Sequence, residues 1–174
     1  MSRQAIKAAV GRAAAYLTEH PEEARYRDAL ARARLGEDLT VDVDGPGGER
    51  LRTDMPRGIG GTATAPSPGW FLRAATASCV ASLIGIRAAV LGLELGAVEV
   101  VVDSESDDRG ILGLDPGVEA GALSMKVVVS IAAAGADRSA LEPLVGWAVD
   151  HCPVTDTVRR SVPVEIVVSE PAGG

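Results

Sequence analysis

Apolar residues near the start of the chain recur at the spacing of an amphipathic helix. They fall at Ile6, Val10, Ala13, Ala14 and Leu17, with charged residues between them. Pro21 suits the first turn of a second helix, which the pattern predicts to run to about Leu35 with Gly36 as its stop. Residues 1–36 are therefore predicted to form a helical region that covers the core.

The pattern changes to that of β-strands after Gly36. Residues 39–44 alternate apolar and polar side chains, as a half-buried strand does. A turn of glycine and proline at residues 45–48 separates them from a return strand predicted over residues 49–54. A loop rich in glycine and proline follows over residues 55–68.

The longest apolar stretch predicts a central helix over residues 69–95. Ser67 suits its N-cap, and Pro68 suits its first helical position. Nearly every face is apolar or small, which is typical of a helix that is buried on most sides. Arg73 and Arg87 interrupt it, and no run of about 18 apolar residues lacks charge, so we expect no membrane span.

The second half of the chain predicts further strands and helices. Valine-rich segments at residues 98–103 and 125–131 indicate two strands. A helix is predicted over residues 139–150, a short helix over 153–161 and a final strand over 162–168. This order is not a repeating βαβ unit, so it favours an α+β fold over a doubly wound α/β fold.

Length and composition exclude several classes of protein. A chain of 174 residues with 47% apolar residues is expected to form one folded domain with its own core. Only 3% of residues are aromatic, and 17 Lys and Arg against 24 Asp and Glu give a net charge of −7. Both features disfavour nucleic acid and anionic membranes as partners. The first residues lack the apolar segment of a signal peptide, so we expect a cytoplasmic protein.

The candidate chemistry centres on two cysteines, Cys79 and Cys152. In a reducing compartment a cysteine pair is more often catalytic, redox-active or metal-binding than a structural staple. Cys152 precedes Pro153, which can begin a helix, and a helix N-terminus stabilises a thiolate. Cys79 lies among small residues of the long helix, and neither Arg73 nor Arg87 shares its helix face. A packed, structural role stays open for each cysteine.

Other motifs point less clearly to chemistry. The only histidines are His20 and His151, and neither CxxC nor HxxxH spacing occurs, so we expect no metal site. A cysteine-protease pair with His151 has no local signature. The acidic run at residues 103–108 lacks the glycine and glutamate of a calcium loop. Residues 58–63 match the glycine spacing of a dinucleotide-binding motif, but the prolines around them favour a loop that shapes a pocket wall.

Taken in order, these motifs resemble the OsmC/Ohr family of osmotically induced and organic hydroperoxide resistance proteins. The Gly-Gly…Ser-Pro loop at residues 60–68 leads into a helix that carries Ala-Ser-Cys at 77–79. The second motif is His-Cys-Pro-Val at 151–154, followed by Pro-Val-Glu at 163–165. The likeness covers roughly residues 39–170.

The resemblance implies a fold and an assembly. The expected fold is α+β, with long central helices packed against antiparallel sheets. Two intertwined chains would form a homodimer with two sites near the subunit interface. The chain is expected to divide into an N-terminal helical extension at residues 1–36 and an OsmC-like domain at residues 37–174.

The resemblance also implies thiol chemistry that requires no metal or organic cofactor. Cys79 would be the peroxidatic cysteine, which reduces an organic hydroperoxide or hydrogen peroxide, and Cys152 would be the resolving cysteine. An external dithiol would restore both thiols. An arginine from the N-terminal hairpin would hold the thiolate; Arg57 is the first choice, with Arg50 and Arg52 as alternatives.

Gly69 departs from the family pattern, because organic hydroperoxide members typically carry a glutamate directly after the loop proline. This difference leaves two hypotheses open. The first is a thiol-dependent peroxidase that serves in oxidative stress defence. The second is a non-catalytic binding or redox-sensing module that keeps the fold and the cysteines. Peroxide turnover with a dithiol separates them.

Overall fold

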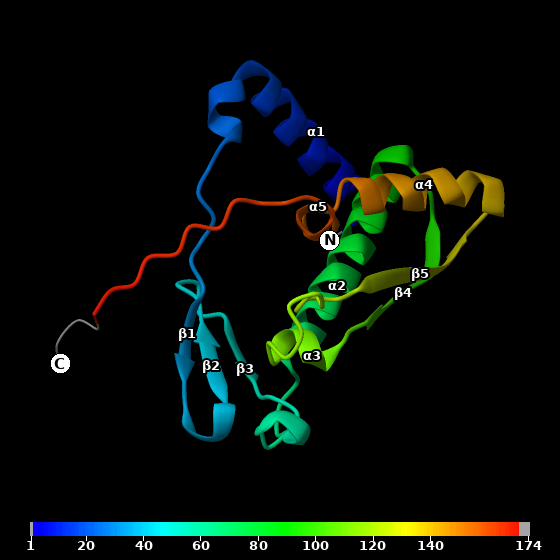
Figure 1. Ribbon diagram of the computed structural model, residues 1–174. Helices are drawn as coiled ribbons and strands as arrows, with labels where there is room; N and C mark the ends of the chain where they lie inside the picture. Colours follow the sequence, from blue (N-terminus) through cyan, green and yellow to red (C-terminus); the bar gives the residue numbers. More distant parts are fainter. Residues whose placement is uncertain (1, 171–174) are drawn as a thin grey trace.

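The computed structural model describes residues 2–170, and it shows a mixed α+β fold (Figure 1). The N-terminal part holds α1 (Arg3–Glu19), β1 (Arg32–Leu35), β2 (Val41–Asp44) and β3 (Arg50–Thr53). The central part holds α2 (Pro68–Leu91), β4 (Leu95–Glu105), α3 (Asp108–Ile111) and β5 (Ser124–Ala133). The last helices are α4 (Arg138–Asp150) and α5 (Pro153–Arg159). The α+β prediction is confirmed.

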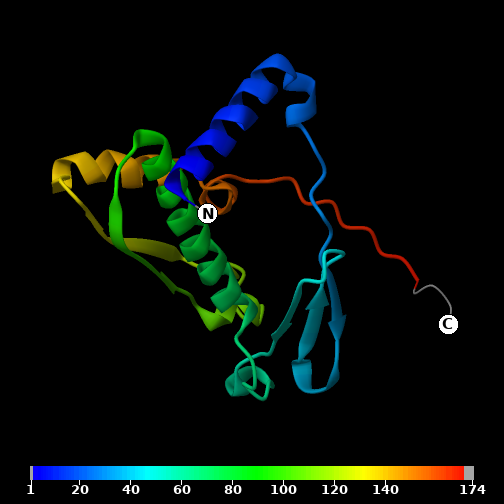
Figure 2. The same cartoon turned by 180° about the vertical axis from the view of Figure 1, so that it is seen from behind.

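The core lies where α2 meets the antiparallel pair β4–β5 and the helix α4 (Figures 1 and 2). Apolar residues four positions apart on α2, including Val80, Ile84 and Ala88, face the core because they share one side of the helix. Leu144 and Ala148 do the same on α4. By length and mean hydropathy (1.7) α2 could cross a membrane, a property that core helices of soluble proteins share. One side of α2 packs in the core, and its buried residues are Thr76, Val80, Ile84, Ala88 and Ala89.

Helix α2 begins as predicted and ends earlier than predicted. Ser67 is its N-cap and accepts a hydrogen bond from the backbone N–H of Trp70. It ends at Leu91 and not near residue 95, because Gly92 adopts a left-handed conformation with φ 76° and its N–H bonds back to the last turn. Residues 92–95 therefore lie outside the helix, and β4 begins at Leu95.

The prediction of a second helix over residues 21–35 is wrong. A short 3-10 turn covers Pro21–Ala24, an extended segment follows, and Arg32–Leu35 forms β1. Residues 32–35 form a strand and not a helix because they pair with β2. Ala33 and Leu35 lie opposite Val43 and Val41 and so join the apolar face of β2. The division of the chain at residue 36 stays a prediction, and the β1–β2 pairing crosses it.

The three-stranded sheet β1–β2–β3 has two different faces. One carries Arg32, Arg34, Asp42, Asp44, Arg50 and Arg52, and the other carries Ala33, Leu35, Val41, Val43 and Leu51. The sheet stands away from α2 (Figures 1 and 2). Leu35 is 72% and Leu51 39% exposed, whereas Val41 and Val43 are half-buried, so this apolar face is only partly covered within residues 2–170.

The final strand predicted over residues 162–168 is not formed within the single chain. The segment runs away from α5 as an extended tail (Figure 1), and residues 161–170 have no strand assignment. Val164 and Ile166 are 81% and 83% exposed. The valine-rich sequence was typical of a strand, but a strand also needs a neighbour that supplies backbone hydrogen bonds, and the described part of the chain supplies none.

Candidate thiol site

The fold brings Cys79 and Cys152 together although they lie far apart in the sequence. Cys79 lies within α2 and is partly buried, whereas Cys152 is fully buried in the core cluster. Cys79 packs against this cluster, and the two thiols lie close enough for each to shift the pKa of the other. Both cysteines are free thiols. The fold therefore makes the two cysteines neighbours within one chain.

The turn between α4 and α5 places Cys152. It is the N-cap of α5, and its sulfur accepts a hydrogen bond from the backbone N–H of Thr155 at 3.5 Å. The single proton of the Thr155 hydroxyl is shared between the carbonyl oxygens of Val149, at 2.5 Å, and Cys152, at 3.0 Å. This buried threonine ties the end of one helix to the start of the next. Sequence reasoning missed it, although a threonine three residues after an N-cap cysteine was a readable signal.

The two thiols differ in acidity within the chain. Burial raises the pKa of Cys152, but the hydrogen bond to its sulfur from the backbone N–H of Thr155 and the neighbouring thiol of Cys79 outweigh burial and leave that pKa lowered. Burial and the neighbouring Cys152 raise the pKa of Cys79, and the backbone N–H of Val154 acts in the opposite direction. Cys79 is thus the less acidic thiol unless a cation from elsewhere reaches it.

Near the thiols, His151 at the end of α4 and Arg87 of α2 both contact Trp147. The ring of His151 stacks on Trp147 at 4.2 Å, and its Nδ1 lies 2.8 Å from the Trp147 carbonyl oxygen. On the same indole, the guanidinium carbon of Arg87 lies 4.8 Å from the ring centroid. Among residues 2–170 no hydrogen bond joins His151 to either cysteine, so the geometry gives no support to a cysteine-protease pair.

The structure does not bring Arg57 to the thiols of its own chain. Arg57 is exposed in a short 3-10 turn (Arg57–Ile59), where its Nε donates to the Thr62 carbonyl oxygen at 3.3 Å. This loop precedes α2 (Figure 1), and Cys79 lies roughly 16 Å along the helix axis from Pro68, at about 1.5 Å per residue. Of the alternatives, Arg52 pairs with Asp42, Nε to Oδ1 at 2.6 Å.

The loop that carries Arg57 is organised by a residue that sequence reasoning missed. Asp54 is 1% exposed, and its carboxylate accepts hydrogen bonds from Met55, Thr62 and Thr64. These donors, above all the Thr62 hydroxyl, hold the pKa of Asp54 well below its usual range. The loop also forms one wall of a cavity of about 370 Å³, which Leu72 and Arg73 of α2 help to line. The prediction of a pocket wall is consistent with that position.

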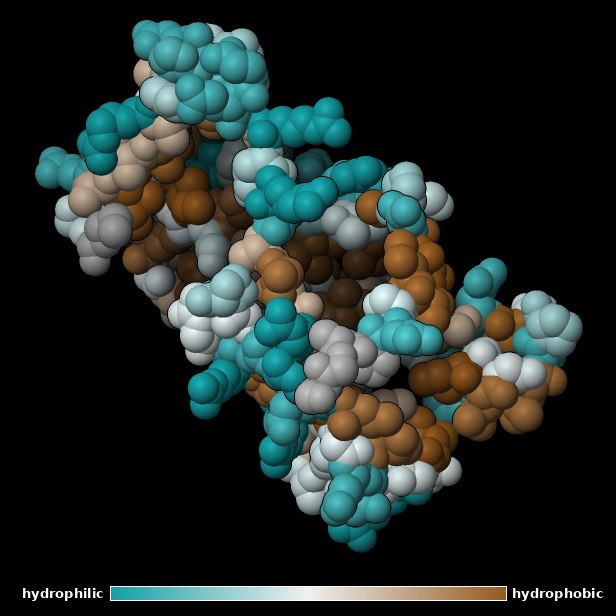
Figure 3. Space-filling view, turned by 90° about the vertical axis from the view of Figure 1, so that its left-hand side faces the viewer, coloured by the Kyte–Doolittle hydropathy of each residue, from teal (hydrophilic) through white to brown (hydrophobic). Residues whose placement is uncertain are grey.

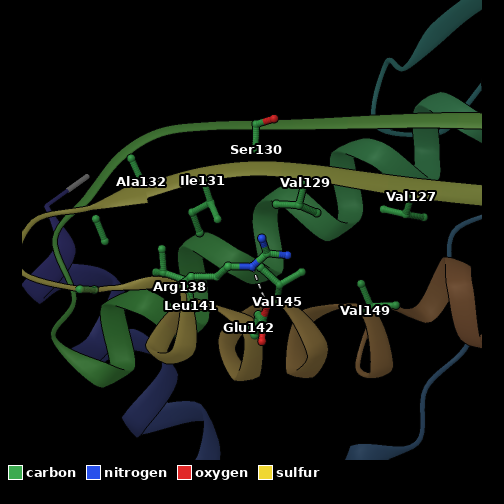
Figure 4. Close-up of a pocket in the computed structure, with 12 residues that line it drawn as sticks. Val127, Val129, Ser130, Ile131, Ala132, Arg138, Leu141, Glu142, Val145 and Val149 are labelled. Carbon is green, nitrogen blue, oxygen red and sulfur yellow. Dashed lines mark hydrogen bonds and ion pairs between the residues drawn. The ribbon is translucent and has the colours of Figure 1, made fainter.

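A larger groove lies away from the thiols, between β5 and α4 (Figure 4). Its volume is about 800 Å³, and its walls are apolar side chains such as Val129 and Leu141. Arg138 and Glu142 form an ion pair at its edge, Nε to Oε1 at 2.8 Å. Neither cysteine lines it.

A different cluster lies on the N-terminal surface, where His20, Glu22 and Glu23 bring their potential ligand atoms within 4.8 Å of one another. The hydroxyl of Tyr16 donates to Glu23 at 2.7 Å. These side chains are largely exposed and have no link to the thiol site.

Comparison with known proteins identifies the family. The family model described as "OsmC-like protein" matches residues 61–167, so the chain belongs to the OsmC family. The match begins in the loop before α2 and includes both cysteines, which confirms the resemblance seen in the motifs. No curated protein matches the chain significantly.

Solved structures share the fold at low sequence identity. An OsmC-like protein from Mycoplasma pneumoniae superposes with a TM-score of 0.66 at 14% identity, over 78% of this chain and 89% of that one. An organic hydroperoxide resistance protein OsmC from Legionella pneumophila, described as a predicted redox protein, superposes with a TM-score of 0.59 at 24% identity. The match covers 78% of this chain and 91% of that one. The organic hydroperoxide resistance protein OhrB of Bacillus subtilis superposes with a TM-score of 0.52 at 20% identity, over 76% of this chain and 91% of that one.

Proposed function

We propose that this protein is a thiol-dependent peroxidase that reduces organic hydroperoxides or hydrogen peroxide. The observation that carries the proposal is the packing of Cys79 against the core cluster that contains Cys152, where each thiol shifts the pKa of the other. Hydroperoxide resistance proteins among the structural neighbours add support from the fold. A cytoplasmic location, where thiols stay reduced, is part of the proposal.

The proposed cycle begins at Cys79, the more accessible of the two cysteines. Its thiolate attacks one peroxide oxygen, so that an S–O bond forms and the O–O bond breaks. The leaving oxygen takes a proton and departs as an alcohol or water, and Cys79 becomes a sulfenic acid. The peroxide is reduced by two electrons, and the sulfur is oxidised by two.

Cys152 completes the cycle as the resolving thiol. Its thiolate attacks the Cys79 sulfur, an S–S bond forms, and the S–O bond breaks to release water after protonation. An external dithiol then reduces the disulfide through two exchange steps and is itself oxidised. The hydrogen bonds that lower the pKa of Cys152 favour the thiolate that this resolving step needs.

Because the pKa of Cys79 is raised within the chain, a cation from another subunit is needed to stabilise its thiolate. An arginine suits this role because it stays charged. Arg57 is our choice: it is exposed, and it has no ion pair among the residues that the structure describes. Since it lies far from the thiols of its own chain, we infer that Arg57 of the partner subunit stabilises the Cys79 thiolate.

A homodimer is part of this proposal, and two unpartnered surfaces support it. The apolar face of β1–β2–β3 and the exposed side chains of the C-terminal tail would cost free energy in water. Figure 3 shows hydrophobic surface in a hollow between hydrophilic regions. A second copy would cover both surfaces, and the tail would gain strand neighbours.

The alternative is a binding or redox-sensing module that turns over no peroxide. Gly69 favours it, because a glycine leaves no side chain at the start of α2 to assist chemistry. In this case Cys79 and Cys152 would form a disulfide slowly under oxidation and would act as a signal.

Peroxide consumption by the purified protein with dithiothreitol tests the proposal. We expect turnover of tert-butyl hydroperoxide or hydrogen peroxide that Cys79→Ser abolishes and Cys152→Ser reduces sharply. Thr157→Val, an exposed change on α5, serves as the control and retains full turnover. Wild-type consumption no faster than that of Cys79→Ser would establish the non-catalytic alternative.

A further inference from the structure

We propose that Asp54 is the positioning residue of the thiol site, because it folds residues 54–66 into a rigid loop that presents Arg57. The inference rests on the proposed function, in which Arg57 supplies the cation for Cys79. It assigns a task to a buried carboxylate that takes no part in the chemistry itself.

The Asp54 carboxylate is fully engaged with its own loop. Its Oδ1 accepts from the backbone N–H groups of Met55, at 2.7 Å, and Thr62, at 3.3 Å. Its Oδ2 accepts from the Thr62 hydroxyl at 2.6 Å, and from the backbone N–H and hydroxyl of Thr64, both at 2.9 Å. An ionised carboxylate makes such hydrogen bonds stronger than neutral ones. The charge is therefore satisfied inside the loop and does not neutralise Arg57.

The backbone closes around this carboxylate. The N–H of Asp54 donates to the Pro66 carbonyl oxygen at 3.2 Å, which joins the two ends of the loop. Ala63 has φ 54°, a left-handed conformation that costs free energy for a residue other than glycine. Its neighbours Thr62 and Thr64 are both bound to Asp54, so the carboxylate supports the strained residue between them.

The loop holds Arg57 through Thr62. The Thr62 N–H and hydroxyl are held by Asp54, and its carbonyl oxygen accepts from Arg57 Nε at 3.3 Å. This contact fixes one edge of the guanidinium and leaves the Nη1 and Nη2 donors available for an anion. Asp54 thus acts on Arg57 through one intervening residue.

Close packing inside the loop adds to its rigidity. A Cβ at Gly61 would collide with the carbonyl group of Met55, so only glycine fits there. Gly60 has φ 96°, which glycine adopts without strain. Arg57 is consequently carried by a fixed support and loses little conformational entropy when it meets a thiolate.

Alkylation of Cys79 by iodoacetamide in a Cys152→Ser background tests the inference. We expect Asp54→Asn to slow alkylation at neutral pH about tenfold, the same loss as Arg57→Ala, and to cause no further loss when added to Arg57→Ala. Thr62→Ser, which keeps the hydroxyl, is expected to retain the wild-type rate, and Thr62→Val to lose part of it. Asp137→Asn removes another carboxylate that accepts backbone hydrogen bonds, at the start of α4, and is expected to leave the rate unchanged.

The outcomes separate the inference from the proposed function. If Arg57→Ala slows alkylation and folded Asp54→Asn does not, the positioning role is overturned while the proposed function stands. If Arg57→Ala changes nothing, the arginine assignment itself is wrong. If Asp54→Asn fails to fold, the comparison of Thr62→Val with Thr62→Ser decides, and equal rates for these two would overturn the inference.

Discussion

The thiol of Cys79, inside α2, is a neighbour of Cys152 at the N-cap of α5, and each shifts the pKa of the other. Burial and the neighbouring Cys152 raise the pKa of Cys79, whereas the backbone N–H of Thr155 and the neighbouring Cys79 lower that of Cys152 against the effect of burial. The first proton lost within the chain is therefore that of Cys152. This order suits a resolving thiol that is ready when its neighbour is oxidised.

Mild oxidation is expected to join the two cysteines within one chain. Hydrogen peroxide in slight excess should form a Cys79–Cys152 disulfide, because Cys79 already packs against the cluster that contains Cys152. Peptide mapping without reductant would show the linked peptides. In Cys152→Ala, dimedone should instead trap a sulfenic acid on Cys79. Disulfides only between chains would contradict the assignment.

Each thiol is expected to shift the acidity of the other in opposite directions. Cys152→Ala should lower the pKa of Cys79, because a neighbour that ionises first is removed. Cys79→Ala should raise the pKa of Cys152, because the neighbouring thiol that lowers this pKa is removed. The ultraviolet absorbance of the thiolate, followed against pH, measures both. Unchanged values in both variants would show that the thiols do not interact in solution.

Thr155→Val is expected to destabilise the turn between α4 and α5. The carbonyl oxygens of Val149 and Cys152 would lose their hydroxyl donor in a buried place, which costs about 1–3 kcal/mol in the free energy of unfolding. Urea unfolding measures this loss. Thr157→Val removes an exposed hydroxyl that bonds the Pro153 carbonyl, and it should cost clearly less. Equal losses would show that Thr155 has no special role.

Gly69→Glu is expected to stabilise the fold and to raise peroxide turnover. A side chain fits, since its Cβ would meet only Arg73 Nη1 at 3.8 Å and Ser67 Oγ at 3.9 Å. A carboxylate in the first turn of α2 should add about 0.3–1 kcal/mol through the helix dipole. Gly146→Glu in α4 is a matched control. It gains the same helix propensity, but its carboxylate does not lie in the first turn of α2. Equal turnover in both variants would show that the missing glutamate does not limit activity.

Charges on the C-terminal tail are expected to break the proposed dimer. Val164→Asp with Ile166→Asp would place two carboxylates on side chains that are 81% and 83% exposed in the single chain. A monomer would tolerate them, whereas a dimer that buries them should dissociate at micromolar concentration. Sedimentation velocity distinguishes the two, with Ser169→Asp as the control. A wild-type protein that already sediments as a monomer would contradict the dimer.

The local signals of the chain determined most of its elements. Ser67 and Pro68 placed the start of α2, because a side-chain cap and a proline at the first turn act over a few residues. Valine-rich segments placed β4 and β5 for the same reason, since β-branched residues favour a strand locally. The motifs around Cys79 and Cys152 also sufficed to identify the OsmC family, which the family match confirms.

Contacts between distant residues decided the rest. Strand β1 was predicted as a helix because its sequence alone does not show that Leu35 pairs with Val41. Sequence reasoning passed over Asp54, because four of its five donor groups belong to Thr62 and Thr64, which reach it only when the loop folds back. The thiol pair arises in the same way, since only the packing of α5 against α2 brings Cys152 to Cys79. Residue spacing determines a helix or a strand over a few positions, whereas a site depends on the packing of elements that are far apart in the chain.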